Sequence, residues 1–231
     1  MPRMTRLGFP VAALAAMAAT APARASIVLS QVVVDILPTS DTAQNIEVSN
    51  DGTDTAYVVA EPAEITAPGQ PAEARTPIVD PGVGGLLVSP QRLILQPGER
   101  KAIRIAAIAP RGTTDRIYRV TIKPVAGPVT AAVSALKLLV GYDVLVVYRP
   151  AAPAARIVGE RTGDTFTLSN LGNSNADLFD GRVCTGTAAA TCRPLPSKRL
   201  YAGQVWQQPL SGPGTIHYRV SVGATASEQQ F

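Results

Sequence analysis

Short apolar runs follow one another along the chain, and hydrophobic and polar residues alternate within them. In "KAIRIAAI", residues 101–108, Ile103 and Ile105 alternate with Arg104, so one face is expected to be buried and the other wet. "QNIEVSN", residues 44–50, has the same period and runs into "NDG", a strong turn signal. Twenty Pro and nineteen Gly residues separate such runs, and little helix is expected. We therefore predict an all-β chain of the sandwich type.

One run is too long for an ordinary strand. It is "ALKLLVGYDVLVVYRPAAPAAR", residues 135–156. At about 3.3 Å per residue, residues 136–148 would extend over about 40 Å, twice the length of a typical strand. Residue parity sorts this run into a mixed face and a face that is apolar throughout. The apolar face consists of Leu136, Leu138, Val140, Tyr142, Val144, Val146 and Tyr148.

The two halves of this apolar face have different expected roles. Val144, Val146 and Tyr148 are predicted to belong to the core of their own domain, whereas the earlier residues exceed what a compact sandwich covers. An uncovered strand of this kind promotes aggregation unless something pairs with it. Two explanations fit the pattern equally: a partner protein receives the strand by β-strand addition, or a loop of the same domain covers it.

Prolines divide the chain into two predicted domains. Pro150 and Pro153 end the long run, because proline cannot donate to a strand ladder. Downstream segments such as "TIHYRVSV", residues 215–222, still alternate. We predict two β-sandwich domains, residues 26–149 and 150–231, joined by a short stiff linker. Residues 67–85, rich in Pro, Gly and Ala, are predicted to form a loose loop.

The N-terminal segment has the pattern of a secretory signal peptide. Two arginines precede an apolar run, and "ARA" provides small residues for cleavage after Ala25, so residues 1–25 are predicted to be removed. A retained membrane anchor is the alternative, but the run is short and Ala-rich. Cleavage lowers the 21 Lys and Arg by three, to 18, against 17 Asp and Glu. This balance argues against nucleic acid or an anionic membrane surface as the main partner, and no membrane insertion is expected after cleavage.

The residue types needed for catalysis or metal binding are scarce. Cys184 and Cys192 are the only cysteines, and in a secreted chain an even pair predicts a disulfide. With His217 as the only histidine, they cannot complete a usual zinc site. The chain has no "GxSxG" nucleophile motif, and "PGVGG", residues 81–85, lacks the Lys-Ser/Thr of a phosphate-binding loop. A pair of carboxylates cannot be placed from sequence. We predict a binding protein without metal or cofactor, not an enzyme.

Five segments together form a pattern of a known family. They are "SND" (49–51), "SPQRLILQPGERKAIRI" (89–105), "DRIYRVTIKPV" (115–125), "VLVVYRPAA" (144–152) and "CRPLPSKRLYAGQVW" (192–206). These segments resemble the periplasmic chaperones of the chaperone–usher pathway, which assemble pili (fimbriae), and the resemblance covers nearly all of the chain after the signal peptide. Residues 192–206 are similar to the second domain of the archaic subclass, which is associated with spore-coat-U-like subunits.

The resemblance implies a fold, a location and a function. It implies two immunoglobulin-like domains in a boomerang arrangement, in the periplasm, working without a nucleotide or other cofactor. Such chaperones bind pilus subunits that lack a final strand, complement them with a strand of their own and deliver them to an outer-membrane usher. Residues 133–148 would be the lending strand, with Leu136, Leu138, Val140 and Tyr142 as the subunit-binding side chains. The alternative function is that of a secreted two-domain adhesin-like binding protein.

One departure from the family pattern concerns the subunit's C-terminal carboxylate. Better-known members hold it with an arginine of the first strand and a lysine of the long strand. Here the aligned positions hold Val34 or Asp35 and Leu145, in keeping with the archaic assignment.

If a cation still binds that carboxylate, it must come from another strand. Arg119 and Arg116 are the first candidates, and Lys123 is the third. Arg116 fits a structural ion pair near the domain junction equally well, and Arg104 is expected to be structural.

Overall fold

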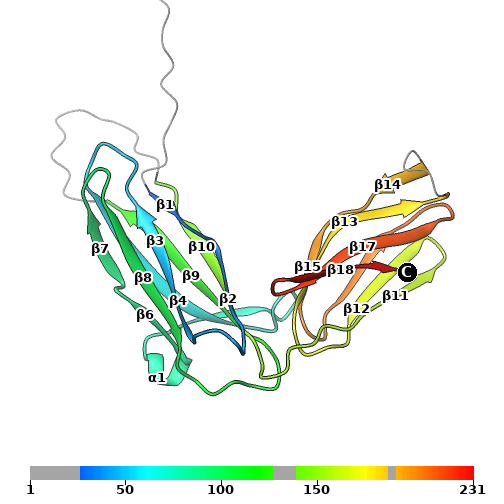
Figure 1. Ribbon diagram of the computed structural model, residues 1–231, viewed down its shortest axis with the longest axis horizontal. Helices are drawn as coiled ribbons and strands as arrows, with labels where there is room; N and C mark the ends of the chain where they lie inside the picture. Colours follow the sequence, from blue (N-terminus) through cyan, green and yellow to red (C-terminus); the bar gives the residue numbers. More distant parts are fainter. Residues whose placement is uncertain (1–26, 127–138, 187–190) are drawn as a thin grey trace, which may run out of the picture.

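The computed structural model describes residues 27–126, 139–186 and 191–231. The predicted signal peptide, residues 1–25, lies outside the described part of the chain. Figure 1 shows two all-β lobes that meet at an angle, as the predicted boomerang requires. Each lobe consists of two packed sheets, so the chain forms two immunoglobulin-like sandwiches.

The first domain pairs a four-stranded sheet with a six-stranded sheet. The four-stranded sheet has the order β1 (Val28–Leu29), β3 (Ala43–Ser49), β8 (Arg100–Ala107), β6 (Leu86–Ser89). The six-stranded sheet has the order β2 (Val33–Ile36), β10 (Tyr142–Tyr148), β9 (Arg116–Val125), β4 (Ala56–Thr66), β5 (Ala74–Pro77), with β7 (Arg92–Leu95) also beside β4. The short helix α1 (Pro81–Gly84) precedes β6.

The core between these sheets follows the predicted alternation. In β8, Ile103 and Ile105 are fully buried while Arg104 is exposed. In β10, the residues predicted for the domain's own core, Val144, Val146 and Tyr148, are buried in the same cluster. The loop prediction for residues 67–85 was wrong in part, because β5 and α1 lie within it.

The second domain has a separate core and smaller sheets. One sheet has the order β11 (Ile157–Thr162), β12 (Thr165–Asn170), β16 (Val205–Pro209). The other has the order β14 (Cys192–Pro194), β13 (Ala176–Cys184), β17 (Thr215–Val222), β18 (Thr225–Gln230), with β15 (Lys198–Leu200) beside β13. The core between them includes Phe166, Leu168 and Tyr218.

The same Asn-x-Gly corner stabilises both domains. Asn50, after β3, is buried, and its side-chain amide donates to the carbonyls of Asp54 and Leu95 while its oxygen accepts from the Gly52 amide. Asn170, at the end of β12, makes the corresponding bonds to the Ser174 and Leu200 carbonyls and the Gly172 amide. Each buried amide thus satisfies main-chain groups that the turn leaves without ladder partners.

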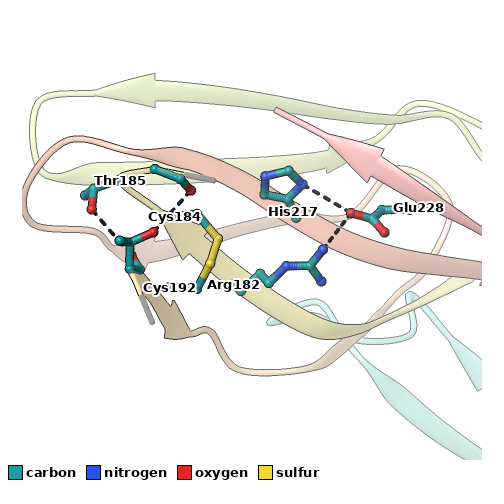
Figure 2. Close-up of a disulfide and its surroundings, with 8 residues drawn as sticks. Arg182, Cys184, Thr185, Cys192, His217 and Glu228 are labelled. Atoms are coloured by element: carbon teal, nitrogen blue, oxygen red, sulfur yellow. Dashed lines mark hydrogen bonds and ion pairs between the residues drawn. A yellow bond between two sulfur atoms is a disulfide. The ribbon is translucent and has the colours of Figure 1, made fainter. Parts of the chain in front are cut away.

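The predicted disulfide is present. Cys184 and Cys192 are bonded between the adjacent strands β13 and β14 (Figure 2). In the small second domain such a bridge limits the unfolded ensemble and contributes about 2–3 kcal/mol for a loop of this size.

Candidate functional site

The six-stranded sheet turns one face toward the second domain. In β4, β9 and β10 the even-numbered residues face the core, so the odd-numbered residues form the opposite, outer face. Near the junction this outer face is apolar and buried, and Tyr201 of the second domain packs against it. The residues that Tyr201 covers are Ile65, Ile117, Leu145 and Val147.

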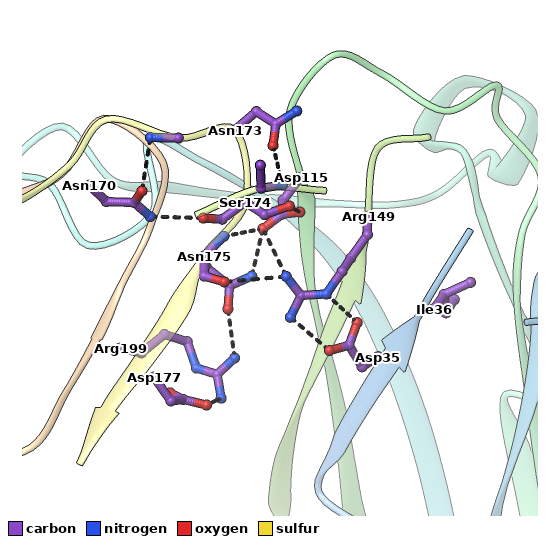
Figure 3. Close-up of polar contacts among 12 residues, drawn as sticks. Asp35, Ile36, Asp115, Arg149, Asn170, Asn173, Ser174, Asn175, Asp177 and Arg199 are labelled. Carbon is purple, nitrogen blue, oxygen red and sulfur yellow. Dashed lines mark hydrogen bonds and ion pairs between the residues drawn. The ribbon is translucent and has the colours of Figure 1, made fainter. Parts of the chain in front are cut away.

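A buried charge network links the domains beside this contact (Figure 3). The side chain of Arg149 is only 2% exposed and donates to both carboxylate oxygens of Asp35 at 2.7 Å, and to the Asn175 carbonyl at 3.2 Å. Asp115 lies 3.9 Å from Arg149 and accepts from the Ser174 hydroxyl at 2.8 Å and from the Asn175 amide groups at 2.5 and 2.6 Å. Charged side chains of the first domain therefore bind uncharged polar groups of the second domain where the chain passes from one to the other.

A second polar contact joins the domains at the β15–β16 turn. Gln204 donates from its side chain to the Gly69 carbonyl at 2.5 Å and accepts from the Tyr201 amide at 3.0 Å. Gly69 has a φ of 70°, and a Cβ there would lie 2.4 Å from the Gln204 side chain, so the contact requires glycine. Together with the Arg149 network, this contact fixes the orientation of the two sandwiches.

The start of β10 has a free edge. Its ladder with β9 covers Tyr142 to Tyr148, whereas its ladder with β2 covers only Leu145 to Tyr148. Among the described residues, those from 142 to 144 therefore have a ladder partner on the β9 side alone. An unpaired edge of this kind is a template for another strand.

The predicted subunit-binding residues are placed in part by the structure. Leu136 and Leu138 lie outside the described residues. Val140, just before β10, is 50% exposed. Tyr142 is partly buried, packs against the core of its own domain, and donates from its hydroxyl to the Ile27 carbonyl at 3.1 Å. The apolar face thus changes from exposed to internal between Val140 and Tyr142.

Exposed valines near this free edge were missed by the sequence reasoning. Val32 and Val33 are 49% and 42% exposed, and Val33 is the ladder partner of Leu145. Val28, in β1, is also exposed. The available signal was "QVVVD", residues 31–35, where apolar residues occupy both faces of one strand.

Three cations were predicted near the carboxylate of a bound subunit, and the structure places them on different faces of β9. Arg116 is an even-numbered residue of β9 and faces the core, whereas Arg119 and Lys123 are odd-numbered and lie on the outer face. Arg116 pairs with Glu64 at 2.8 Å and donates to the Gly84 carbonyl at 3.1 Å, the structural ion pair left open by the sequence. Lys123 lies on the outer face and pairs with Glu61 at 2.8 Å.

Arg119 lies on the outer face of β9, beside the apolar residues that contact Tyr201 of the second domain. It is the ladder partner of Leu145. Its Nη1 donates to the Asp143 carbonyl at 3.2 Å, and its Nε lies 3.7 Å from the Asp143 carboxylate. Burial raises the pKa of Tyr201, while the charges of Arg119 and Arg199 act against that rise. Arg119 therefore lies next to Leu145, which belongs to the apolar cluster in contact with Tyr201.

Asp143 is held from two directions. Arg75 of β5 donates to its two carboxylate oxygens at 2.9 and 3.2 Å, and the Thr121 hydroxyl donates at 3.1 Å. Burial raises the pKa of Asp143, but these hydrogen bonds and the charges of Arg75 and Arg119 outweigh burial and lower the pKa below the usual value. The group is therefore ionised at neutral pH.

The positions aligned with the known carboxylate anchor carry no free cation. Val34 is buried in the core, Leu145 is buried against the second domain, and the Asp35 carboxylate is bound by Arg149. A subunit carboxylate would need a different partner from the one used by the better-known members.

The remaining chemical groups lie apart from this surface. His217, on β17, contacts Glu228 at 3.2 Å, and Glu228 also pairs with Arg182 at 2.7 Å (Figure 2). Within residues 27–126, 139–186 and 191–231, no cluster of three or more His, Cys, Asp or Glu side chains could hold a metal ion. In the same part of the chain, no helix is long and apolar enough to cross a membrane.

Comparison with known proteins gives structural matches alone. No protein-family model matches the sequence, and no curated protein matches it. The class 5 fimbriae chaperone CfaA is similar in structure, with a TM-score of 0.67 and 18% identity over 88% of this chain and 98% of that one. A chain from the complex of the Salmonella enterica SafA pilin with the SafB chaperone has a TM-score of 0.62 and 18% identity, covering 91% and 98%.

A third match comes from the archaic Csu pili of Acinetobacter baumannii. It is a chain of the pre-assembly complex of CsuC and CsuE, chaperone and tip adhesion subunit, with a TM-score of 0.62 and 12% identity over 89% of this chain and 98% of that one. The TM-scores of these matches establish a shared fold. The chain has the two-domain, all-β fold of the fimbrial chaperones.

Proposed function

We propose that this chain is a periplasmic chaperone of the chaperone–usher pathway, of the archaic subclass. It binds pilus subunits, complements them with its own strand and delivers them to an outer-membrane usher. The observation that carries the proposal is the free edge at the start of β10, on a chain with the fimbrial-chaperone fold. The archaic assignment rests on Leu145 and on the sequence of residues 192–206.

The free edge explains how a subunit would be held. Main-chain groups from residue 144 toward the N-terminus pair with the subunit, and alternate side chains fill its groove. Leu136, Leu138 and Val140 are the proposed side chains, and Tyr142 marks the entry of the strand into the chaperone's own core. Burial of three such side chains contributes roughly 5–8 kcal/mol before ordering costs. A folded subunit then exchanges this strand for one from another subunit at the usher.

The proposal is tested by refolding a pilus subunit from the organism that encodes this chain. Diluting the denatured subunit into buffer with the purified mature chain is expected to give a soluble one-to-one complex, measured by size-exclusion chromatography with light scattering. Without the chain, the subunit is expected to aggregate. Equal aggregation with and without the chain would contradict a chaperone role and favour an adhesin-like binding protein.

Arg119 is the proposed partner of the subunit's C-terminal carboxylate. Arg119→Ala is expected to weaken complex formation about tenfold, because a charge-assisted contact to a carboxylate contributes about 1.5 kcal/mol. Arg104→Ala is the matched control, since Arg104 is an exposed arginine on the outer side of the four-stranded sheet. Both affinities are measured by titration after confirming equal melting temperatures. A larger loss for Arg104→Ala would contradict the assignment.

A further inference from the structure

Two arginines compete for one carboxylate on the outer face of the six-stranded sheet. Arg75, Arg119 and Asp143 lie on three different strands, β5, β9 and β10. Their formal charges leave one positive charge in excess. The neighbouring pair of Lys123 and Glu61 is neutral as a unit and does not change this balance.

Arg75 binds the Asp143 carboxylate more closely than Arg119 does. Arg75 takes both oxygens of Asp143 within 3.2 Å and also donates to the Thr121 hydroxyl at 2.6 Å. Arg119 lies 3.7 Å from the same carboxylate, and its closer bond is to the main-chain carbonyl of Asp143. In the described part of the chain, the Nη2 group of Arg119 makes no hydrogen bond. Arg119 is thus oriented by the backbone of β10 but is only weakly neutralised.

We propose that Arg75, by binding the carboxylate of Asp143, keeps Arg119 available for the C-terminal carboxylate of a pilus subunit. Arg75 is a positioning residue that acts through Asp143 and does not itself touch the subunit. This inference rests on the proposed chaperone function and on Arg119 as its anchor. If Arg75 were absent, Asp143 would take Arg119 as its ion-pair partner and compete with the incoming carboxylate.

This arrangement predicts opposite effects for the two halves of one ion pair. Arg75→Gln is expected to weaken recognition of the carboxylate about threefold to fivefold, the range for one partly exposed ion pair. Asp143→Asn removes the competitor and is expected to retain or strengthen recognition. The double variant is expected to behave like Asp143→Asn. A merely structural ion pair would instead give losses for both single variants.

The test uses one pilus subunit in two forms, prepared by peptide ligation with a C-terminal carboxylate or a C-terminal amide. The ratio of the two affinities isolates the contribution of the carboxylate, because misfolding or a displaced strand weakens both forms alike. Arg92→Gln is the matched control, an exposed arginine of β7 opposite Val59 on the same face of the sheet. It is expected to leave the ratio unchanged.

The possible results test the positioning role of Arg75 separately from the proposed chaperone function. Failure of the wild-type chain to capture either form would overturn the proposed function. Equal capture of both forms would overturn the carboxylate anchor. A wild-type preference for the carboxylate form that Arg75→Gln leaves intact, or that Asp143→Asn also abolishes, would overturn the positioning role of Arg75.

Discussion

Replacing Arg149 by Met is expected to lower the free energy of unfolding by about 3–5 kcal/mol. The Arg149 guanidinium is nearly inaccessible to water and is the cationic partner of Asp35 and Asp115. Met retains much of the apolar volume but leaves both carboxylates without that partner. Removing one member of a buried ion pair costs more than the pair contributes, because the remaining charge stays desolvated. The loss is measured by urea denaturation of the mature chain at neutral pH.

A second substitution separates charge from packing at this site. Asp35→Asn added to Arg149→Met removes one uncompensated carboxylate and is expected to recover part of the lost stability. Arg104→Ala, on an exposed face, is expected to change stability by less than about 0.5 kcal/mol. A loss below about 1 kcal/mol for Arg149→Met would mean that water reaches the two carboxylates and that the network does not fix the domain junction.

Residue parity predicted the internal side chains of the first domain well. Successive side chains of a strand alternate between its faces, so the pattern alone placed Ile103 and Ile105 in the core and Arg104 outside. The same rule placed Val144, Val146 and Tyr148 inside. It also separates Arg116 from Arg119, which are three residues apart and therefore on opposite faces of β9, although both were predicted as carboxylate partners.

Local sequence patterns did not predict which strands pair with one another. The free edge at the start of β10 exists because β2 begins its parallel ladder only at Val33, opposite Leu145. Arg75 was not predicted as a site residue because the four residues of β5, "ARTP", are all exposed and show no alternation. Its strand conformation comes from antiparallel pairing with the preceding strand β4, which the composition of these four residues does not indicate.

The lending strand is the central claim, and substitutions at Leu136 and Leu138 have the largest expected effect on function. The double variant Leu136→Glu, Leu138→Glu places two charges where apolar side chains would enter the subunit. Each buried leucine contributes roughly 2 kcal/mol, and burying an unpaired carboxylate adds a further penalty. We therefore expect the affinity for a subunit to fall by at least a hundredfold, while the chain itself folds normally.

The matched control is a double variant with the same added charge on two other strands. Ile94→Glu and Val205→Glu replace exposed apolar residues of β7 and β16, strands that pair with β4 and β12 and not with β10, and are expected to leave the affinity unchanged.

The most direct measurement is co-expression of a pilus subunit with the wild-type chain or with Leu136→Glu, Leu138→Glu, followed by purification of the periplasmic complex. We expect the double variant to accumulate in the periplasm with the wild-type melting temperature while its subunit is degraded. An undiminished yield of complex from the double variant would contradict the lending strand.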